Sequence, residues 1–150
     1  MKDILGLGAF LTLVIGGGTL IGVNNLPGEW YAGLVKPAFN PPNWIFAPVW
    51  TLLYIFIAVA GWRVWSRGPA NAAQRIWWGQ LGLNFLWSPV FFSIQSTGGA
   101  LAIIVALLAM IAAFIALTRR ADPVAALLFI PYAAWVSFAT LLNAELFALN

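Results

Sequence analysis

Cysteine and histidine are absent from the 150-residue sequence, and charged residues make up only 7% of it. Without cysteine there can be no disulfide framework and no thiol nucleophile, and the common zinc sites need cysteine or histidine. A soluble domain carries roughly 25% charged residues. The small charged fraction, together with a hydrophobic fraction of 63%, therefore indicates an integral membrane protein.

Long charge-free windows divide the chain into helical segments. The window from Ile76 to Thr118 is about twice the length that one spanning helix needs, and SIQSTGGA at its centre is typical of a turn. Apolar runs of this length exclude the strands of an outer-membrane barrel. The first segment lacks a cleavage site, so we interpret it as a helix and not a signal peptide. We expect an all-α integral membrane protein with one domain, residues 1–150, and a bundle of five transmembrane helices at about 4–23, 44–65, 75–95, 99–118 and 123–146.

The basic residues collect on one side of such a bundle. Five spans place the two termini on opposite sides of the membrane, and Lys36 is then the only basic residue on the side of the C-terminus. The positive-inside rule therefore predicts a multi-pass protein of the bacterial inner membrane with a cytoplasmic N-terminus. The basic residues on the cytoplasmic side are Lys2, Arg63, Arg67, Arg75, Arg119 and Arg120.

Three tryptophans lie too deep in the expected helices to belong to an interfacial aromatic belt. At about 1.5 Å per residue, Trp50 lies roughly 9 Å below the start of its helix, and Trp87 and Trp135 lie roughly 12–15 Å from the same surface. Four other tryptophans, which bracket the cytoplasmic linker, fit such a belt. These are Trp62, Trp65, Trp77 and Trp78.

Helical spacing gives each deep tryptophan neighbours on the same face. The three faces combine rings with amides, and an amide in the membrane should face protein or a cavity because an unpaired polar group is costly in lipid. Such a chamber fits a pocket for a flat apolar ligand, although rings at these positions could equally serve only to pack the helices. The candidate residues are Phe46, Trp50 and Tyr54 on one face, Gln80, Asn84, Trp87 and Phe91 on the second, and Trp135, Ala139 and Asn143 on the third.

The loop before the second span combines prolines, aromatic residues and one lysine. Pro41 and Pro42 stiffen this loop at low entropic cost, so we expect them to hold it as a lid above the chamber. Trp30 and Tyr31 are expected to close over the same mouth. Lys36 is placed either to meet an acidic group of a ligand or to face solvent and lipid headgroups.

Three segments resemble the TspO/MBR family of tryptophan-rich sensory proteins, which includes the mitochondrial translocator protein: WYAGLVKPAFNPPNWIFAPVWTLLY (30–54), LNFLWSPVFF (83–92) and IPYAAWVSFATLLN (130–143). The resemblance implies a five-helix bundle, often a homodimer, in the lipid bilayer. It also implies that porphyrins such as protoporphyrin IX and haem bind as ligands, not as obligatory cofactors, alongside synthetic benzodiazepine and isoquinoline compounds; no nucleic-acid partner is expected. The family's pocket residues map onto Trp30, Tyr31, Pro41, Pro42, Trp50, Asn84 and Trp135.

Two features limit what the resemblance carries over. The cholesterol motif of animal members needs a tyrosine and a basic residue near the end of the last helix, and LLNAELFALN contains neither. The usual axial ligands of haem iron are histidine and cysteine. Because both are absent, we favour a metal-free porphyrin, or haem held by stacking.

Three functions are compatible with these features. We favour a receptor or sensor that binds tetrapyrroles and takes part in their regulation or traffic. The alternative is an enzyme that degrades porphyrin under light, with Trp50 or Trp135 as the electron partner of the excited macrocycle. The two glutamates lie near helix ends or loops, so no general acid–base site is visible and the ligand would supply the chemistry. A tetrapyrrole or sterol transporter is the third, but the spans lack the internal charges and paired repeats of ion-coupled carriers.

Overall fold

The computed structural model describes residues 2–68 and 71–150, and within these residues it contains helices and no strand. The all-α prediction is therefore confirmed. Two elements, η1 and η3, are single turns of π-helix, and η2 is a 3₁₀ turn. In chain order the elements are α1 (Lys2–Leu11), η1 (Thr12–Gly16), α2 (Gly17–Asn24), α3 (Gly28–Ala32), η2 (Asn43–Ile45), α4 (Phe46–Ser66), α5 (Ala72–Ser88), η3 (Pro89–Ser93), α6 (Thr97–Thr118) and α7 (Pro123–Leu149).

Four helical stretches are long and apolar enough to cross a membrane: Asp3–Asn24, Asn43–Ser66, Thr97–Thr118 and Pro123–Leu149. The fifth expected span corresponds to α5 and η3, which are helical but are not among these four. Polar side chains at Gln74, Arg75, Gln80 and Asn84 lower the mean hydropathy of this stretch. Length and composition therefore support four of the five expected spans within the described chain.

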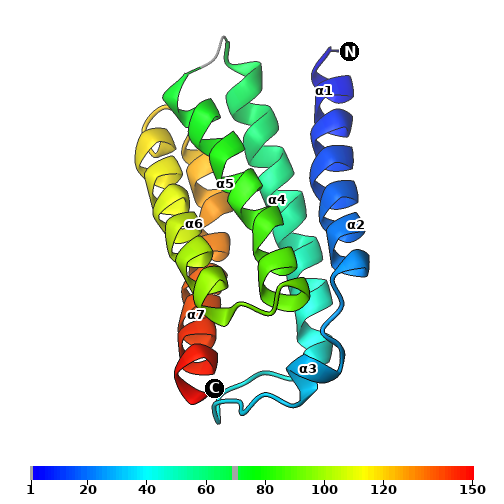
Figure 1. Cartoon of the computed structure of the whole chain (residues 1–150). Helices are drawn as coiled ribbons and strands as arrows, with labels where there is room; N and C mark the ends of the chain where they lie inside the picture. Colours follow the sequence, from blue (N-terminus) through cyan, green and yellow to red (C-terminus); the bar gives the residue numbers. More distant parts are fainter. Residues whose placement is uncertain (1, 69–70) are drawn as a thin grey trace.

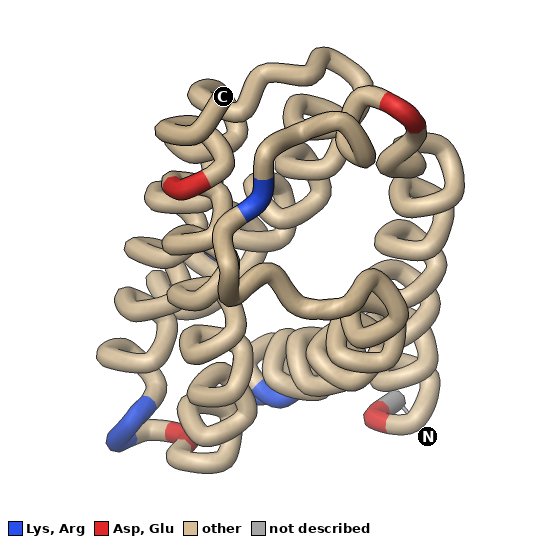
Figure 2. Tube along the Cα trace, turned by 90° about the horizontal axis from the view of Figure 1, so that it is seen from below, with Lys and Arg blue, Asp and Glu red and all other residues tan. Residues whose placement is uncertain are grey.

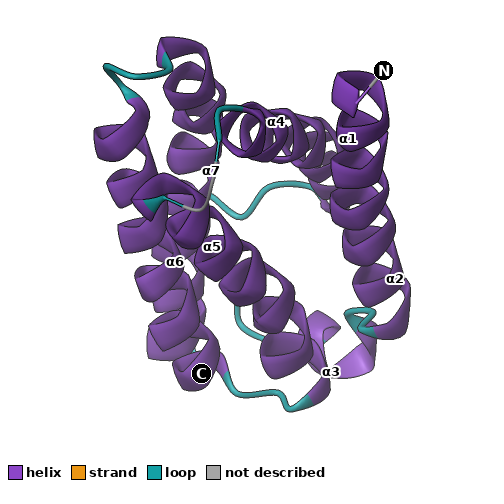
Figure 3. Ribbon diagram, turned by 90° about the horizontal axis from the view of Figure 1, so that it is seen from above, coloured by secondary structure: helices purple, strands orange, loops and turns teal. Residues whose placement is uncertain are grey.

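The long helices form a ring. α1 packs on α4, α4 on α7, α7 on α6 and α6 on α5, and α5 closes the ring through contacts with both α4 and α2. The N-terminus and the C-terminus lie at opposite ends of the bundle (Figure 1), and Figure 3 shows the helices along its axis. The end crossed by α3 is called the α3 end. The other end, where α6 turns into α7, is called the Asp122 end.

Charged residues avoid the middle of the bundle. Every charged residue of the described chain lies in a loop or within five residues of a helix end. Figure 2 shows the result, with long uncharged stretches of chain between a few charged positions. This distribution is expected of a protein whose helices cross lipid, because a charge in the hydrocarbon region is costly.

Asp122 joins the ends of α4 and α7. Its carboxylate caps α7 by accepting a hydrogen bond from the backbone N–H of Ala125 at 3.2 Å, and it accepts bonds from Arg63 at 3.0 and 3.1 Å and from Arg67 at 3.1 Å. Burial acts to raise the pKa of this carboxyl, but the hydrogen bonds from Arg63 and Ala125 and the charges of Arg63 and Arg67 hold the pKa below its ordinary value. The side chain therefore stays ionised although it is buried.

Several aromatic side chains near the Asp122 end are closely packed. Trp77 is 1% exposed and lies against Gly61, where an added Cβ would come within 2.3 Å of the Trp77 ring. The Trp77 Nε1–H donates to the carbonyl oxygen of Ile57 at 2.9 Å. Phe114 and Phe129 bring α6 and α7 together with ring centroids 4.1 Å apart. Trp77 is expected in an interfacial belt because it lies beside the cytoplasmic linker. In the structure it is a core residue, and its indole N–H is hydrogen-bonded.

Candidate functional site

A cavity of about 620 Å³ occupies the α3 end of the ring. Its wall is built by α2, α4, α5 with η3, and α7, and α6 contributes two apolar side chains, Ile104 and Leu107. α3 contributes Tyr31, whose buried hydroxyl has a raised pKa because burial disfavours its charged form. Ten of the predicted residues line this cavity: Tyr31, Phe46, Trp50, Tyr54, Asn84, Trp87, Phe91, Trp135, Ala139 and Asn143.

Eight of the lining residues are aromatic, and apart from Tyr31 they belong to α4, to α5 with η3, and to α7. On α4, Trp50 lies 5.6 Å from Tyr54 between ring centroids, one helical turn away. Trp87 of α5 stacks on Phe91 of η3 at 4.8 Å with an interplanar angle of 23°. Phe46 of α4 lies edge to face against Trp135 of α7, with their ring centroids 5.7 Å apart. The wall thus offers flat apolar surfaces at several orientations.

Two indole N–H groups in this wall differ in their hydrogen bonding. Trp87 Nε1 donates to Asn143 Oδ1 at 3.0 Å, and Asn143 Nδ2 in turn donates to the carbonyl oxygen of Thr97 at 2.9 Å. The Trp87 ring is therefore held in place. Trp135 Nε1 is buried and makes no hydrogen bond with any residue that the structure describes. A buried donor without a partner is uncommon and costs free energy. Trp62 Nε1 and Gln80 Nε2 are also buried donors without a partner among the described residues, but unlike Trp135 these residues do not line the cavity.

A buried polar relay lies behind the wall. Asn84 Nδ2 donates to the hydroxyl oxygen of Tyr132 at 2.7 Å, and that hydroxyl donates to Gln80 Oε1 at 2.8 Å. Gln80 and Tyr132 are both 0% exposed and do not line the cavity, whereas Asn84 does. Helical spacing had grouped Gln80 with Asn84, but the part played by Tyr132 of α7 follows only from the tertiary structure.

Four predicted residues do not line the cavity. The Lys36 ammonium donates to the carbonyl oxygens of Tyr31, Ala32 and Leu34 at 2.8, 3.4 and 3.3 Å, and it lies 4.6 Å from the centre of the Tyr31 ring. The structure therefore uses Lys36 to cap the end of α3 and does not turn it toward the cavity. Trp30 rests edge-on against Phe91, on the outside of the wall, and Pro41 and Pro42 lie in the loop that leads to η2.

This loop is fastened to α7. Asn150 Oδ1 accepts from the backbone N–H of Val35 at 3.0 Å, and Asn150 Nδ2 donates to the carbonyl oxygen of Val35 at 2.9 Å. Phe39 of the same loop contacts Phe138 of α7 edge to face at 6.1 Å. The loop is thus fastened to the C-terminal part of the chain by specific contacts.

The wall contributed by η1 and α2 was not foreseen. Glycines at 16–18 and 22 suit close helix contact, and Gly18 packs so closely that an added Cβ would lie 2.5 Å from the Tyr54 ring. Gly22 has open space beside it instead and lines the cavity. Asn25, just after α2, accepts a hydrogen bond from the Ser93 hydroxyl of η3, which joins the two elements on this side of the cavity. The glycine cluster is the only sequence signal for this wall.

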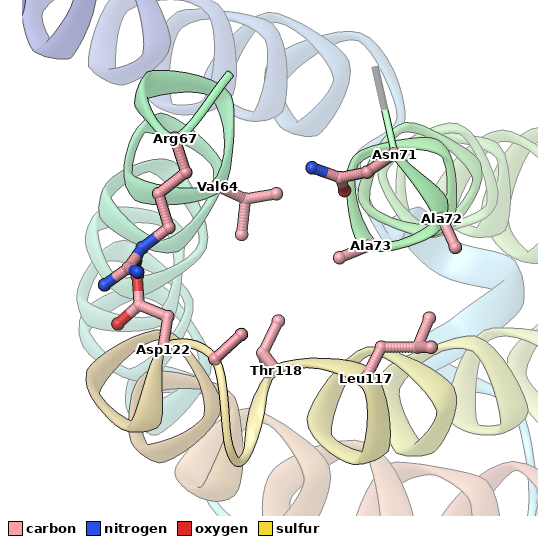
Figure 4. A pocket seen from close by; sticks show the side chains of 9 residues that line it. Val64, Arg67, Asn71, Ala72, Ala73, Leu117, Thr118 and Asp122 are labelled. Atoms are coloured by element: carbon pink, nitrogen blue, oxygen red, sulfur yellow. Dashed lines mark hydrogen bonds and ion pairs between the residues drawn. The ribbon is translucent and has the colours of Figure 1, made fainter. Parts of the chain in front are cut away.

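A second, smaller cavity of about 220 Å³ lies at the Asp122 end. Figure 4 shows Arg67 paired with Asp122 on one side of it and Asn71 on the other, with Val64 beside Arg67 and with Thr118 and Leu117 along the lower side of the view. The carboxylate there is already neutralised by two guanidinium groups, and Asn71 Oδ1 caps α5 by accepting from the backbone N–H of Gln74 at 2.9 Å. These polar groups are engaged in holding the helices together.

The fold and the larger cavity define a multi-pass helical membrane protein with an aromatic chamber at one end. The chain matches the model of the TspO/MBR family over residues 9–149, and it belongs to this family. It is 42% identical over 124 residues to the tryptophan-rich protein TspO of Archaeoglobus fulgidus, with 81% of this chain and 80% of the relative covered.

Relatives from bacteria and animals cover similar shares. The tryptophan-rich sensory protein of Cereibacter sphaeroides is 39% identical over 124 residues, with 83% of this chain and 78% of the relative covered. The human translocator protein is 36% identical over 134 residues, with 84% and 79% covered. The membrane sensory and translocator proteins named here therefore share most of their length with this chain.

Proposed function

We propose that the protein is a membrane receptor for flat, apolar tetrapyrroles, with protoporphyrin IX as the type ligand and haem as a second. The observation that carries this proposal is the cavity of about 620 Å³ walled by Trp50, Trp87 and Trp135 from three different helices. Ligand pockets for small organic molecules measure roughly 300–1,000 Å³ and combine apolar walls with a few polar groups. The names of the relatives, which describe sensory and translocator proteins, agree with a receptor role.

In this proposal the indoles hold the macrocycle by stacking and edge contacts. Trp135 Nε1, which has no partner among the described residues, donates a hydrogen bond to an acceptor atom of the ligand. Because the donor is already desolvated, the bond is formed without an additional cost for stripping water from the protein side. Lys36 is left out of the proposed site, since its ammonium is held by three carbonyl oxygens.

The proposal includes five spans, with α5 and η3 as the fifth, in a bacterial inner membrane with the N-terminus in the cytoplasm. Two observations support it. The α5–η3 helix lies in the ring between α6 and α2, and the two ends of the chain lie at opposite ends of the bundle, as an odd number of passes requires (Figure 1). The pairs Arg63–Arg67 and Arg119–Arg120 sit at the Asp122 end, which the positive-inside rule assigns to the cytoplasm.

The test is equilibrium binding of protoporphyrin IX to the detergent-solubilised protein in the dark, followed by quenching of tryptophan fluorescence. We expect saturable quenching and a loss of affinity of roughly threefold to tenfold for Trp50→Phe and for Trp135→Phe. Trp78→Phe is the matched control, because Trp78 is exposed and does not line the cavity. Its affinity should equal that of the wild type.

Quenching that does not saturate, or equal affinities for all four proteins, would show that the cavity does not hold the porphyrin. Illumination of the complex then separates a receptor from an enzyme. The proposal requires that the porphyrin be recovered intact after light exposure. Bleaching that occurs in the wild type and is lost in Trp50→Phe or Trp135→Phe would replace the receptor with a light-dependent degrading enzyme.

A further inference from the structure

The hydroxyl of Tyr132 stands between two amides and carries a single proton. It accepts from Asn84 Nδ2 at 2.7 Å and donates to Gln80 Oε1 at 2.8 Å. Gln80 and Tyr132 are 0% exposed, so water does not compete for their side of the relay, and Gln80 Nε2 is buried without a partner among the described residues. The orientation of one amide is therefore coupled to the orientation of the other through the hydroxyl proton.

The coupling has a definite consequence for the cavity. Since Gln80 Oε1 takes the hydroxyl proton, Tyr132 can only accept from Asn84, and Asn84 must turn its amide nitrogen toward Tyr132. The carbonyl oxygen of Asn84 is then directed away from the relay. This oxygen accepts no hydrogen bond from any described residue, and it is not among the buried polar atoms without a partner, so it is accessible from the cavity that Asn84 lines.

We propose that Gln80 and Tyr132 set the polarity of the cavity by fixing Asn84 as an acceptor, so that the site selects flat aromatic ligands with an N–H or O–H donor at their edge. This inference rests on the proposed ligand site. Neither Gln80 nor Tyr132 lines the cavity, so both are positioning residues that act through Asn84. In protoporphyrin IX the pyrrole N–H groups lie at the centre of the macrocycle, so the donor at its edge is the O–H of a carboxylic acid, which is neutral in a site of low dielectric.

The cavity then presents one defined acceptor, Asn84 Oδ1 on α5. A ligand with a donor at its edge satisfies this oxygen. A purely apolar ligand of the same shape leaves it unpaired. A site with defined hydrogen-bonding groups rejects the analogue that lacks the matching group, because its own buried polar atoms are then left without partners.

The test uses three flat tricyclic probes of nearly equal size: carbazole with an N–H donor, fluorene with neither donor nor acceptor, and 9-fluorenone with a carbonyl acceptor. Binding of each probe is measured directly by equilibrium dialysis against detergent-solubilised protein, with empty micelles as the blank. We expect the wild type to bind carbazole roughly threefold to tenfold more tightly than fluorene, the gain typical of one hydrogen bond.

The decisive variant is Gln80→Leu. It removes the oxygen that accepts the Tyr132 hydrogen bond. The Tyr132 hydroxyl then donates to Asn84 Oδ1 instead, and the Asn84 amide turns its nitrogen toward the cavity. The advantage of carbazole over fluorene should disappear, and 9-fluorenone should gain on fluorene by a similar factor. Gln74→Leu makes the same substitution on the same helix, at a side chain outside both the relay and the cavity, and should leave all three affinities unchanged.

Tyr132→Phe provides a second variant that keeps the ring and removes only the hydroxyl. Asn84 is then free to turn, so carbazole and 9-fluorenone should both bind more tightly than fluorene, by similar factors. A wild type that prefers 9-fluorenone, an unchanged preference in Gln80→Leu, or an equal loss for all three probes would each overturn the inference. If the probes bind saturably but Gln80→Leu does not change their order of affinity, the inference about Asn84 fails and the proposed ligand site stands. If no probe binds saturably, the proposed ligand site fails with it.

Discussion

At the Asp122 end of the bundle, Trp77 fills the space beside a glycine. At the α3 end, another tryptophan, Trp135, borders a cavity. Trp77 packs against Gly61 and donates its N–H to Ile57. Trp135 meets Phe46 edge to face, and its N–H has no partner in the described chain. The two ends therefore use the same side chain in opposite ways.

The difference shows how a small membrane protein can keep polar and aromatic groups available for binding. At the Asp122 end the glycine contact, the Trp77 hydrogen bond and the ion pairs of Asp122 hold the helix ends in position, although Trp62 Nε1 is buried there without a partner among the described residues. At the α3 end an indole donor and an amide acceptor are left without protein partners around open space. Locally unfavourable features of this kind are expected at functional sites supported by a stable remainder.

The largest effect should come from breaking the ion pairs at the Asp122 end. Asp122→Ala removes the carboxylate that binds two guanidinium groups and caps α7, and we expect it to lower the free energy of unfolding by about 3 kcal/mol. Asp122→Asn keeps a side-chain cap and should lose about 2 kcal/mol. Thermal unfolding in detergent, followed by circular dichroism, measures both.

The pH dependence of the same variants provides a control. The folded-state pKa of Asp122 lies below its ordinary value of 3.8, so the stabilisation is fully present above that value and is lost as the pH falls through the folded-state pKa. The difference in stability between the wild type and Asp122→Asn should be constant from neutral pH down to about pH 5 and shrink below about pH 4. A difference that instead grows on acidification would contradict the role assigned to the carboxylate.

The second effect compares one substitution at both ends. Gly61→Ala would place a Cβ 2.3 Å from the Trp77 ring, which is buried and cannot move aside, and we expect a loss of about 2 kcal/mol in unfolding free energy. Gly18→Ala would place a Cβ 2.5 Å from the Tyr54 ring, which borders the cavity and can swing into it. Its stability loss should stay below about 1 kcal/mol, and protoporphyrin affinity should fall because the cavity is smaller.

Gly82→Ala serves as the reference for this pair, since an added Cβ at Gly82 meets nothing within 4 Å. Alanine favours a helix over glycine by about 1 kcal/mol, so this variant should be as stable as the wild type or slightly more stable. Equal losses of unfolding free energy for Gly61→Ala and Gly18→Ala would show that Trp77 and Tyr54 are packed equally tightly, which would contradict the proposed difference between the two ends.

The helices and the residues that share a helix face could be predicted from the sequence. The helices follow from charge-free apolar runs, and the three-and-four spacing on each helix groups Trp50, Asn84 and Trp135 with their neighbours. The structure places all three around one cavity. These features are local, because a helix face is determined by residues only a few positions apart.

The remaining features depend on contacts between distant segments. Arg63 and Asp122 are 59 residues apart, and no local pattern announces their ion pair. Among the described residues Lys36 is the only cation at its end, and the sequence left a ligand contact and a position facing solvent both open. The path of the loop instead brings its ammonium onto the carbonyl oxygens of Tyr31 and Ala32 at the end of α3. Glycine carries no side chain, so the same residue type suits a close contact at Gly18 and an open wall at Gly22. Only the tertiary structure distinguishes the two.

The smallest expected effect tests the comparison most directly, because it makes one substitution at the two tryptophans themselves. Trp77→Phe removes a satisfied buried donor and should lower the free energy of unfolding by about 1 kcal/mol through the lost hydrogen bond. Trp135→Phe removes a donor that has no partner among the described residues, so relief of its desolvation offsets the lost packing and stability should stay within about 0.5 kcal/mol of the wild type. Thermal unfolding of the ligand-free proteins measures the difference, and protoporphyrin binding should show the reverse order, with only Trp135→Phe impaired. If Trp135→Phe were the less stable variant, its indole would be part of the packed core, and the unpartnered N–H could not be assigned to a ligand.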